Sequence, residues 1–185
     1  MKSLSYDYSK YKNFGHLCEV PKDVLSNLQE YYDILQKVPC THLKTEHYKQ
    51  WFVQTSHSSN SDIDVAFDNW TDNDFLKITK DFFHDYVGTI LRFRFSHLSK
   101  DGILKYHSKH HLPRIHIPLD DSDSLFVIKD DNGVEHSYKL EYGSAHFINV
   151  TLLHKVTFTT YADRKNSFFS FAEFKDKKIE ERFLK

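Results

Sequence analysis

The chain has little of what marks several classes of protein. Its 185 residues include only two cysteines, Cys18 and Cys40, which are too few for a disulfide framework and form no C-x-x-C motif. The N-terminal residues show no apolar run suited to a signal peptide, and no stretch approaches the length of a membrane span. We therefore expect a reduced, cytoplasmic protein without a membrane segment.

Charge of one sign is not in excess either. The chain carries 25 Lys and Arg against 26 Asp and Glu, a net charge of -1, and its sequence pI is near 6.9. This balance gives no support for nucleic acid or an anionic membrane as a partner. With 39% hydrophobic and 28% charged residues and no internal repeat, the chain is typical of one globular domain, residues 1–185.

Aromatic residues and histidine are abundant instead. There are 16 Phe, 11 Tyr and 13 His against 5 Gly and 4 Pro. Aromatic residues favour strands and cores. A single histidine usually lies on the surface or is hydrogen-bonded in a core, so clustering has to decide its role. The stretch "KYHSKHHLPRIHIPL", residues 105–119, gathers four histidines, which indicates either a metal and anion site or a histidine-rich polar loop.

The first part of the chain, about residues 1–88, carries the predicted helices. "PKDVLSNLQEYYDILQ" (21–36) aligns apolar side chains at helical spacing, and "DNDFLKITKDFFHDYV" (72–87) opens on acidic residues that suit a helix N-terminus. The second pattern predicts a core-facing stripe formed by Phe75, Ile78, Phe82 and Tyr86. Between the helices, "KQWFVQTS" and "IDVAFDN" are interpreted as short strands.

From about residue 89 to 175 the pattern changes to short alternating runs separated by turn signals such as "KDG" and "DDNG". The predicted strands are "TILRFRFSH", "RIHIPL", "SLFVIKD", "HSYKLE", "AHFINV", "HKVTFTT" and "NSFFSFAEF". They predict a mainly antiparallel sandwich or barrel with the helices packed on one outer side. In "RIHIPL", Arg114 and His116 share one face, which is either exposed or lines a ligand cavity.

Six polar residues of these runs form the candidate site: Ser96, His107, Arg114, His116, His154 and Arg164. A mononuclear metal needs two or three neutral imidazole or carboxylate ligands from separate elements and leaves positions open for substrates. A dicarboxylate needs a fixed cation at its far end, which the planar fork of arginine supplies better than lysine. Histidines, arginines and a serine on adjacent strands meet both needs.

The order of these residues matches a known family. "RFSHLSKDGILKYH" places a serine eleven residues before His107, "RIHIPL" is an R-x-H-x-x-L strand, and "YGSAHFINVTLLHKV" has an F-x-N-x(4)-H-x-V segment. Arg164 follows ten residues after His154. Together, over about residues 89–171, these pieces resemble the aspartyl/asparaginyl β-hydroxylase-like group of iron(II)- and 2-oxoglutarate-dependent oxygenases.

The resemblance implies a fold and a metal. The family fold is a double-stranded β-helix, an eight-stranded sandwich of the jelly-roll or cupin-like kind, here with N-terminal helices packed on it. His107 and His154 would be the ligands of Fe(2+). No further catalytic residue is implied beyond these metal ligands.

The resemblance also implies the co-substrate and the reaction. Ser96 and Arg164 would hold the distal carboxylate of 2-oxoglutarate, and Arg114 and His116 would lie near its metal-bound end. The family reaction uses O2 and couples decarboxylation of 2-oxoglutarate, which releases succinate and CO2, to hydroxylation of a carbon atom. The cofactor performs the difficult step, and the protein orients and shields it.

One position departs from many related oxygenases, which have a carboxylate ligand two residues after the first histidine. Here that residue is Lys109, whose ammonium has no lone pair and is repelled by a metal ion; the β-hydroxylase branch lacks the carboxylate as well. Lys109, His110 and His111 are interpreted as substrate-side residues, with the two histidines as alternative metal ligands. Asp101 and Asp120 are interpreted as turn residues that are also conceivable donors.

Three functions remain open on the sequence. The preferred one is an oxygenase that hydroxylates an amino acid, free or within a peptide or protein. The second is a non-catalytic β-barrel binding protein that kept the anion pocket and lost redox activity, for which Lys109 is the argument. The third is a sandwich whose histidines are structural. The presence of Arg114, His116 and Arg164 beside two histidines favours the enzyme.

Overall fold

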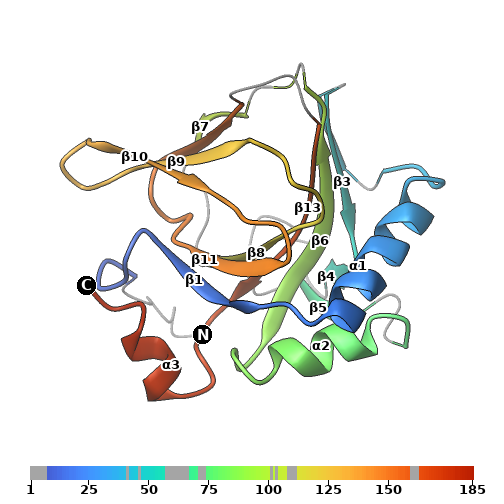
Figure 1. The fold of residues 1–185 in the computed structure, drawn as a ribbon, viewed down its shortest axis with the longest axis horizontal. Coiled ribbons are helices and arrows are strands. Elements are labelled where there is room, and N and C mark those ends of the chain that lie inside the picture. Colours follow the sequence, from blue (N-terminus) through green and yellow to red (C-terminus); the bar gives the residue numbers. More distant parts are fainter. Residues whose placement is uncertain are drawn as a thin grey trace.

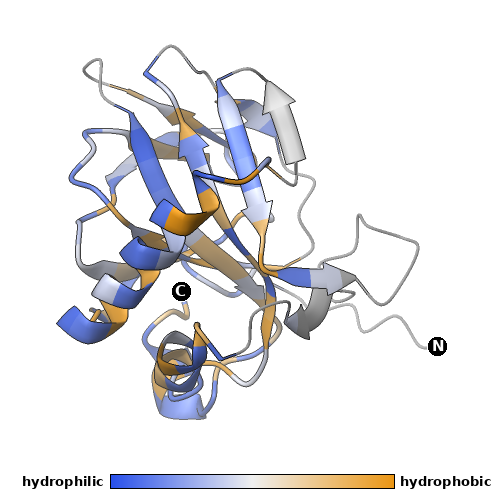
Figure 2. Ribbon diagram, turned by 90° about the vertical axis from the view of Figure 1, so that its right-hand side faces the viewer, coloured by the Kyte–Doolittle hydropathy of each residue, from blue (hydrophilic) through white to orange (hydrophobic). Residues whose placement is uncertain are grey.

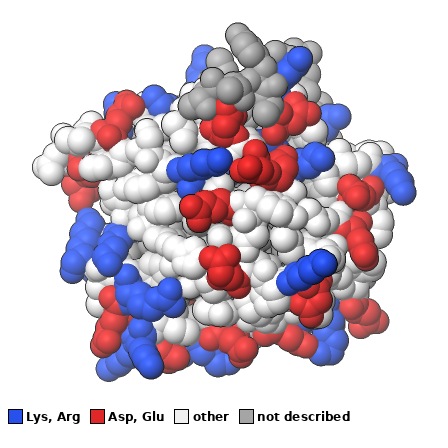
Figure 3. Space-filling model, in the orientation of Figure 1, with Lys and Arg blue, Asp and Glu red and all other residues white. Residues whose placement is uncertain are grey.

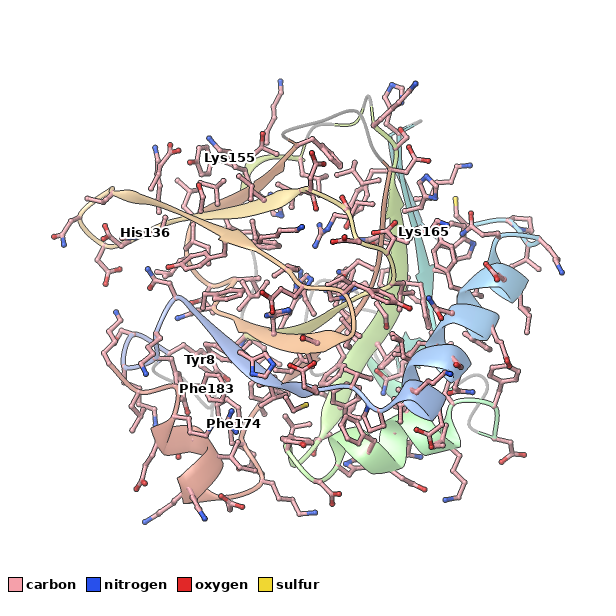
Figure 4. The ribbon with its side chains drawn as sticks, in the orientation of Figure 1. Tyr8, His136, Lys155, Lys165, Phe174 and Phe183 are labelled. Atoms are coloured by element: carbon pink, nitrogen blue, oxygen red, sulfur yellow. The ribbon has the colours of Figure 1, made fainter. Side chains whose placement is uncertain are left out.

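Two facing β-sheets form the centre of the protein (Figure 1). The computed structural model describes residues 8–40, 42–45, 47–56, 67–70, 74–100, 102, 104–107, 112–158 and 163–185. Side chains fill much of the space between the sheets, and an aromatic group that includes Tyr8, Phe174 and Phe183 lies near the place where Tyr11 pairs with Leu184 (Figure 4). The layered arrangement predicted from the alternating runs is therefore present.

The larger sheet has seven strands in the order β1-β11-β8-β13-β6-β3-β2. Their bounds are β1 (Phe14–Glu19), β2 (His42–Thr45), β3 (Tyr48–Phe52), β6 (Ile90–Leu98), β8 (Arg114–Pro118), β11 (Ser144–Ile148) and β13 (Arg164–Phe171). Each neighbouring pair is antiparallel. The three N-terminal strands extend the sheet at both edges, so the first part of the chain is built into it.

The smaller sheet has four strands in the order β10-β9-β12-β7. Their bounds are β7 (Leu104–His107), β9 (Leu125–Lys129), β10 (Glu135–Lys139) and β12 (His154–Thr157). From β6 onward the chain moves from one sheet to the other, with β9 and β10 joined as a hairpin. This alternation is the topology of a jelly roll. A separate pair, β4 (Gln54–Ser56) and β5 (Phe67–Trp70), lies outside both sheets.

Alternation along the strands gives the larger sheet two distinct faces. The outer face carries apolar side chains that join one hydrophobic core with residues of the helices, and the most buried of them are Phe93, Phe95, Ile115, Ile117, Phe147 and Phe169. The inner face looks toward the smaller sheet. Arg114 and His116 lie on this inner face and are buried, which excludes the half-exposed strand.

Within the described ranges, three helices accompany the sheets: α1 (Lys22–Leu35), α2 (Lys77–Phe83) and α3 (Lys177–Glu181). Hydrophilic and hydrophobic residues alternate along the helical ribbons (Figure 2), as expected where one side packs on a core. In the described part of the chain, no helix is both long and apolar enough to cross a membrane. Acidic and basic side chains are interspersed over the face in Figure 3, in line with the balanced composition.

The first helix was predicted correctly, and the second was only partly right. α2 is shorter than the predicted 72–87 segment, and Ile78, assigned to the core stripe, is 40% exposed. The helix buries Thr79 and Phe83, whereas Phe75, Phe82 and Tyr86 of the predicted stripe are partly buried against the same core. Phe82 and Phe83 are adjacent, so the periodic pattern fits two faces, and packing on the sheet selects the face of Phe83, which contacts Phe169.

Several elements differ from the sequence prediction or were missed. The predicted strand "KQWFVQTS" is broken at Val53 into β3 and β4, and of "IDVAFDN" only the residues from Phe67 fall within the described part of the chain. β1, β2, β7 and α3 were not predicted. All four are short, and the partners of β1 and β7 lie far away in the sequence, so local alternation identifies them poorly.

Candidate active site

A small cavity between the two sheets is lined by the six residues selected from the sequence: Ser96, His107, Arg114, His116, His154 and Arg164. Its volume is about 30 Å³, which is room for about two water molecules. The smaller sheet supplies two histidines, and the larger sheet supplies the other four residues. Strand pairing therefore brings together residues that span almost 70 positions of sequence.

His107 and His154 lie side by side on neighbouring strands of the smaller sheet. They are opposite each other in the β7–β12 pairing, and their ring centroids are 4.3 Å apart. The Nδ1 atom of His107 is 2.8 Å from the carbonyl oxygen of Lys105, and that of His154 is 2.8 Å from the carbonyl oxygen of Leu152. A carbonyl only accepts, so Nδ1 carries the ring proton, and Nε2 of each neutral ring keeps a lone pair.

His154 is held in the neutral form that metal binding needs. Its side chain is 2% exposed, and burial, followed by the nearby His107, lowers its pKa to about 3. A buried imidazole avoids the charged form because desolvation penalises it. Near neutral pH, His154 thus offers a lone pair and not a second proton.

The inner face of the larger sheet supplies the cationic wall of the cavity. Arg164 is 7% exposed, and its Nη2 atom has no hydrogen-bond partner among the described residues. Burial lowers the pKa of its guanidinium, while Tyr48 and Asp120 oppose that shift. Ser96 lies on β6 opposite Asn166, two residues beyond Arg164 on β13. Arg114 reaches the same cavity from β8 and donates from Nε to Ser170 Oγ at 3.4 Å.

His116 is fixed as a hydrogen-bond donor toward the cavity. Its Nδ1 accepts a hydrogen bond from the amide nitrogen of Asn166 at 2.8 Å, so the proton of the neutral ring is on Nε2. Nε2 is buried and has no hydrogen-bond partner in the described structure. The ring stacks on Phe168 with a centroid separation of 4.8 Å. Burial, then Arg164 and Arg114, lower the pKa of His116 well below its ordinary value, so the ring stays neutral.

The charge balance of this cavity favours an anion. Arg114 and Arg164 line it, and the lining residues within the described ranges include no Asp or Glu. Asp120 does not enter it, because its Oδ2 accepts a hydrogen bond from the backbone nitrogen of Lys165 at 2.8 Å, the turn role predicted for it. Burying two guanidinium groups costs free energy that a bound anion recovers. A carboxylate would also satisfy the vacant donors of Arg164 and His116.

The donors present fit an open metal site better than a closed one. Within the described ranges, no three side chains of His, Cys, Asp or Glu gather where a metal could bind. Two imidazole ligands leave several coordination positions to a co-substrate and water, as catalytic sites require and structural zinc sites do not. The fit of the residues to iron with a chelating 2-oxo acid is therefore adequate.

Some predicted residues fall outside the described part of the chain. Lys109, His110 and His111, the substrate-side candidates, are among these undescribed residues, and so is Asp101. Their predicted roles stay predictions.

Sequence reasoning missed other polar residues of the cavity. Asn166 lines it beside Arg164, and Tyr48 lines it from β3. Asn166 had a usable signal, because it lies two residues after Arg164 on one strand and so shares its face. Tyr48 had none, because its position depends on the pairing of β3 with β6, two segments about 50 residues apart.

Solved structures with the same fold are described as oxygenases of the 2-oxoglutarate type. An oxidoreductase of the 2OG-Fe(II) oxygenase family from Burkholderia pseudomallei aligns with 78% of this chain and 77% of its own, at a TM-score of 0.57 and 11% identity. A prolyl-4-hydroxylase from Pseudomonas putida aligns with 90% of this chain and 96% of its own, at a TM-score of 0.56 and 9% identity. HygX from Streptomyces hygroscopicus, with nickel and 2-oxoglutarate bound, aligns with 94% of this chain and 87% of its own, at a TM-score of 0.57 and 11% identity. The chain has a double-stranded β-helix fold.

This similarity confirms the fold predicted from the strand pattern and the motifs. No protein-family model matches the sequence, and no curated protein matches it. At identities of 9 to 11%, the likeness establishes the fold alone. The residues of the cavity have to carry the argument for activity.

Proposed function

We propose that this protein is an iron(II)- and 2-oxoglutarate-dependent oxygenase that hydroxylates an amino acid, free or within a peptide or protein. The observation that carries the proposal is the pairing of two adjacent histidines on one sheet with a cationic wall on the other, around one cavity. The motif order around His107, Arg114 and His154 supports the aspartyl/asparaginyl β-hydroxylase-like group as its place within this class. The similar solved structures support the general kind of reaction.

In this proposal His107 and His154 hold the metal through Nε2. Bound iron would supply the activation of O2 that amino-acid side chains do not provide. The backbone carbonyls of Lys105 and Leu152 fix the two rings in the tautomer that presents Nε2. The aromatic ring of Phe126, stacked on His154 at a centroid distance of 5.4 Å, keeps water from one side of that ligand.

The larger sheet would bind and orient 2-oxoglutarate. Arg164 and Ser96 hold the distal carboxylate, and Nε2–H of His116 with Arg114 binds the end nearest the metal. These donors are buried, so each acts in a medium of low dielectric where hydrogen bonds to a charged group are strong. A dicarboxylate is larger than the two waters that the cavity accommodates, so binding requires the lining side chains to move apart.

Anaerobic titration of the protein with iron(II) and 2-oxoglutarate tests this proposal without the unknown substrate. We expect the visible charge-transfer band of the metal–2-oxo acid chelate. His107→Ala and His154→Ala should each remove the band, and Arg164→Ala should shift the titration to higher 2-oxoglutarate concentration.

A parent protein that binds 2-oxoglutarate but gives no band with iron would contradict the proposal. It would instead fit a binding protein that kept the anion pocket. A band that survives in both histidine variants would show that other residues hold the metal.

A further inference from the structure

Two polar side chains of β3 lie beside the proposed carboxylate end of the cavity. Gln50 is opposite Ser96 in the β3–β6 pairing, and Tyr48 is opposite Leu98, which is in turn opposite Arg164 on β13. Opposite residues of paired strands point to the same face, so Tyr48 and Gln50 belong to the inner face. Tyr48 lines the cavity together with Ser96 and Arg164.

A hydrogen bond from Gln50 sets the direction of the Tyr48 hydroxyl. The amide nitrogen of Gln50 donates to the hydroxyl oxygen of Tyr48 at 2.5 Å, and Gln50 is 4% exposed. Because the oxygen accepts this bond, its own proton is available for another acceptor. Tyr48 is also close enough to Arg164 to act electrostatically on the guanidinium.

We propose that Tyr48 donates a hydrogen bond to the distal carboxylate of the co-substrate and so makes the site selective for 2-oxo acids that end in a second carboxylate. Gln50 is the positioning residue that keeps the Tyr48 proton directed into the cavity. The inference rests on the proposed function and deepens it. Neither residue lies in the segment that resembles the oxygenase motifs, so this part of the specificity comes from the first part of the chain.

A comparison of two ligands separates this role from a structural one. 2-Oxoglutarate and 2-oxovalerate share the metal-binding 2-oxo acid end, and the second has a methyl group in place of the distal carboxylate. Affinities of both are measured by calorimetry on the Mn(II)-loaded protein, and the readout is the preference, the ratio of the two dissociation constants. Tyr142→Phe is the matched control, because Tyr142 is 44% exposed and does not line the cavity.

We expect Tyr48→Phe to reduce the preference for 2-oxoglutarate by about tenfold or more, the effect of losing one hydrogen bond to a charged group. Gln50→Leu should reduce it by about threefold, because the hydroxyl remains but loses its orientation. Neither change should alter the affinity for 2-oxovalerate, and Tyr142→Phe should leave both affinities unchanged.

An unchanged preference in Tyr48→Phe, in a protein whose parent prefers 2-oxoglutarate, would overturn the inference and leave the proposed function standing. Equal losses for both ligands would overturn it too, because they would indicate a structural role. A parent that binds metal but neither 2-oxo acid would overturn the proposed function itself, and the inference with it.

Discussion

The two faces of the seven-stranded sheet are made by alternate residues of the same strands, and both are buried. On β6, Phe95 of the outer face is 0% exposed and Ser96 of the inner face is 4% exposed. On β13, Phe169 and Asn166 are 0% and 1% exposed. The outer face packs aromatic rings against helices, whereas the inner face holds arginines, histidine and polar side chains around a cavity.

Burial by itself therefore does not separate the core from the site. Burying apolar rings stabilises the fold, but burying arginine or a histidine nitrogen without a full set of partners costs free energy. We interpret the outer face as the main source of stability and the inner face as an arrangement that a ligand completes. The expected effects of substitution should differ accordingly.

The largest difference between the faces should appear in folding stability. Phe169→Ala on the outer face removes a ring stacked on Phe93 at 5.6 Å and should lower the free energy of unfolding by about 3–5 kcal/mol. Arg114→Met on the inner face should change it by less than about 1 kcal/mol or raise it, because an apolar side chain replaces a buried charge. Denaturant unfolding measures both. Equal losses would remove the distinction between the faces.

Acid should destabilise the protein through His154, which the smaller sheet contributes to the cavity. The pKa of His154 is lowered to about 3 in the fold, against about 6.5 in an unfolded chain. Above pH 6.5 both states are neutral and the histidine contributes nothing; as the pH falls toward 3, only the unfolded chain takes up the proton. At about pH 4.5 this difference should cost about 2–3 kcal/mol of stability.

Unfolding of the parent and of His154→Phe at pH 7.5 and 4.5 tests this dependence. The variant should lose less stability between the two conditions, whereas His16→Gln, at an exposed position, should lose as much as the parent. An identical loss in all three proteins would assign the acid sensitivity to other groups.

Removing the guanidinium of Arg164 from the inner face should weaken binding of the co-substrate. Arg164→Ala should reduce the free energy of 2-oxoglutarate binding by about 1.5–3 kcal/mol, the range for hydrogen bonds to charged groups. Arg182→Ala is the charge-matched control, because Arg182 donates to the backbone of Leu17 far from the cavity. Calorimetric titration should detect no effect of this control; equal weakening would mean that only general charge matters.

Asn166→Asp should invert the hydrogen bond that fixes His116. A carboxylate accepts from Nδ1–H, so Nε2 would lose its proton in the neutral ring and stop donating into the cavity. We expect about tenfold weaker 2-oxoglutarate binding, equivalent to about 1.4 kcal/mol. Nitrogen NMR of the His116 ring reports the tautomer directly. A variant that binds weakly with the tautomer unchanged would place the cause elsewhere.

The smallest effect is expected at Lys109. As an ammonium in contact with the metal would be repelled, we expect its flexible side chain to point away, with the head in solvent. Lys109→Ala should then keep iron affinity and 2-oxoglutarate turnover within about tenfold of the parent. His107→Ala should abolish both. A large gain of iron affinity in Lys109→Ala would indicate that the lysine occupies the place of the metal.

Much of the fold followed from local patterns in the sequence. The alternation in "TILRFRFSH" and "RIHIPL" predicts strands and assigns Arg114 and His116 to one face, because successive side chains of a strand point to opposite sides. The same rule identifies β9 to β13 to within three residues at each end. The spacing of serine, histidine and arginine allowed six cavity residues to be named before their positions were known.

Only the tertiary structure decided which faces meet. The sequence determined that β8 has a polar and an apolar face, but both are buried, because a second sheet covers one and helices cover the other. It predicted a helix near residue 80, but packing against Phe169 decided that Phe83 is buried and Ile78 is exposed. It offered no sign that Tyr48 reaches the cavity. Pairing between strands about 50 residues apart is a property of the whole chain, and no local periodicity records it.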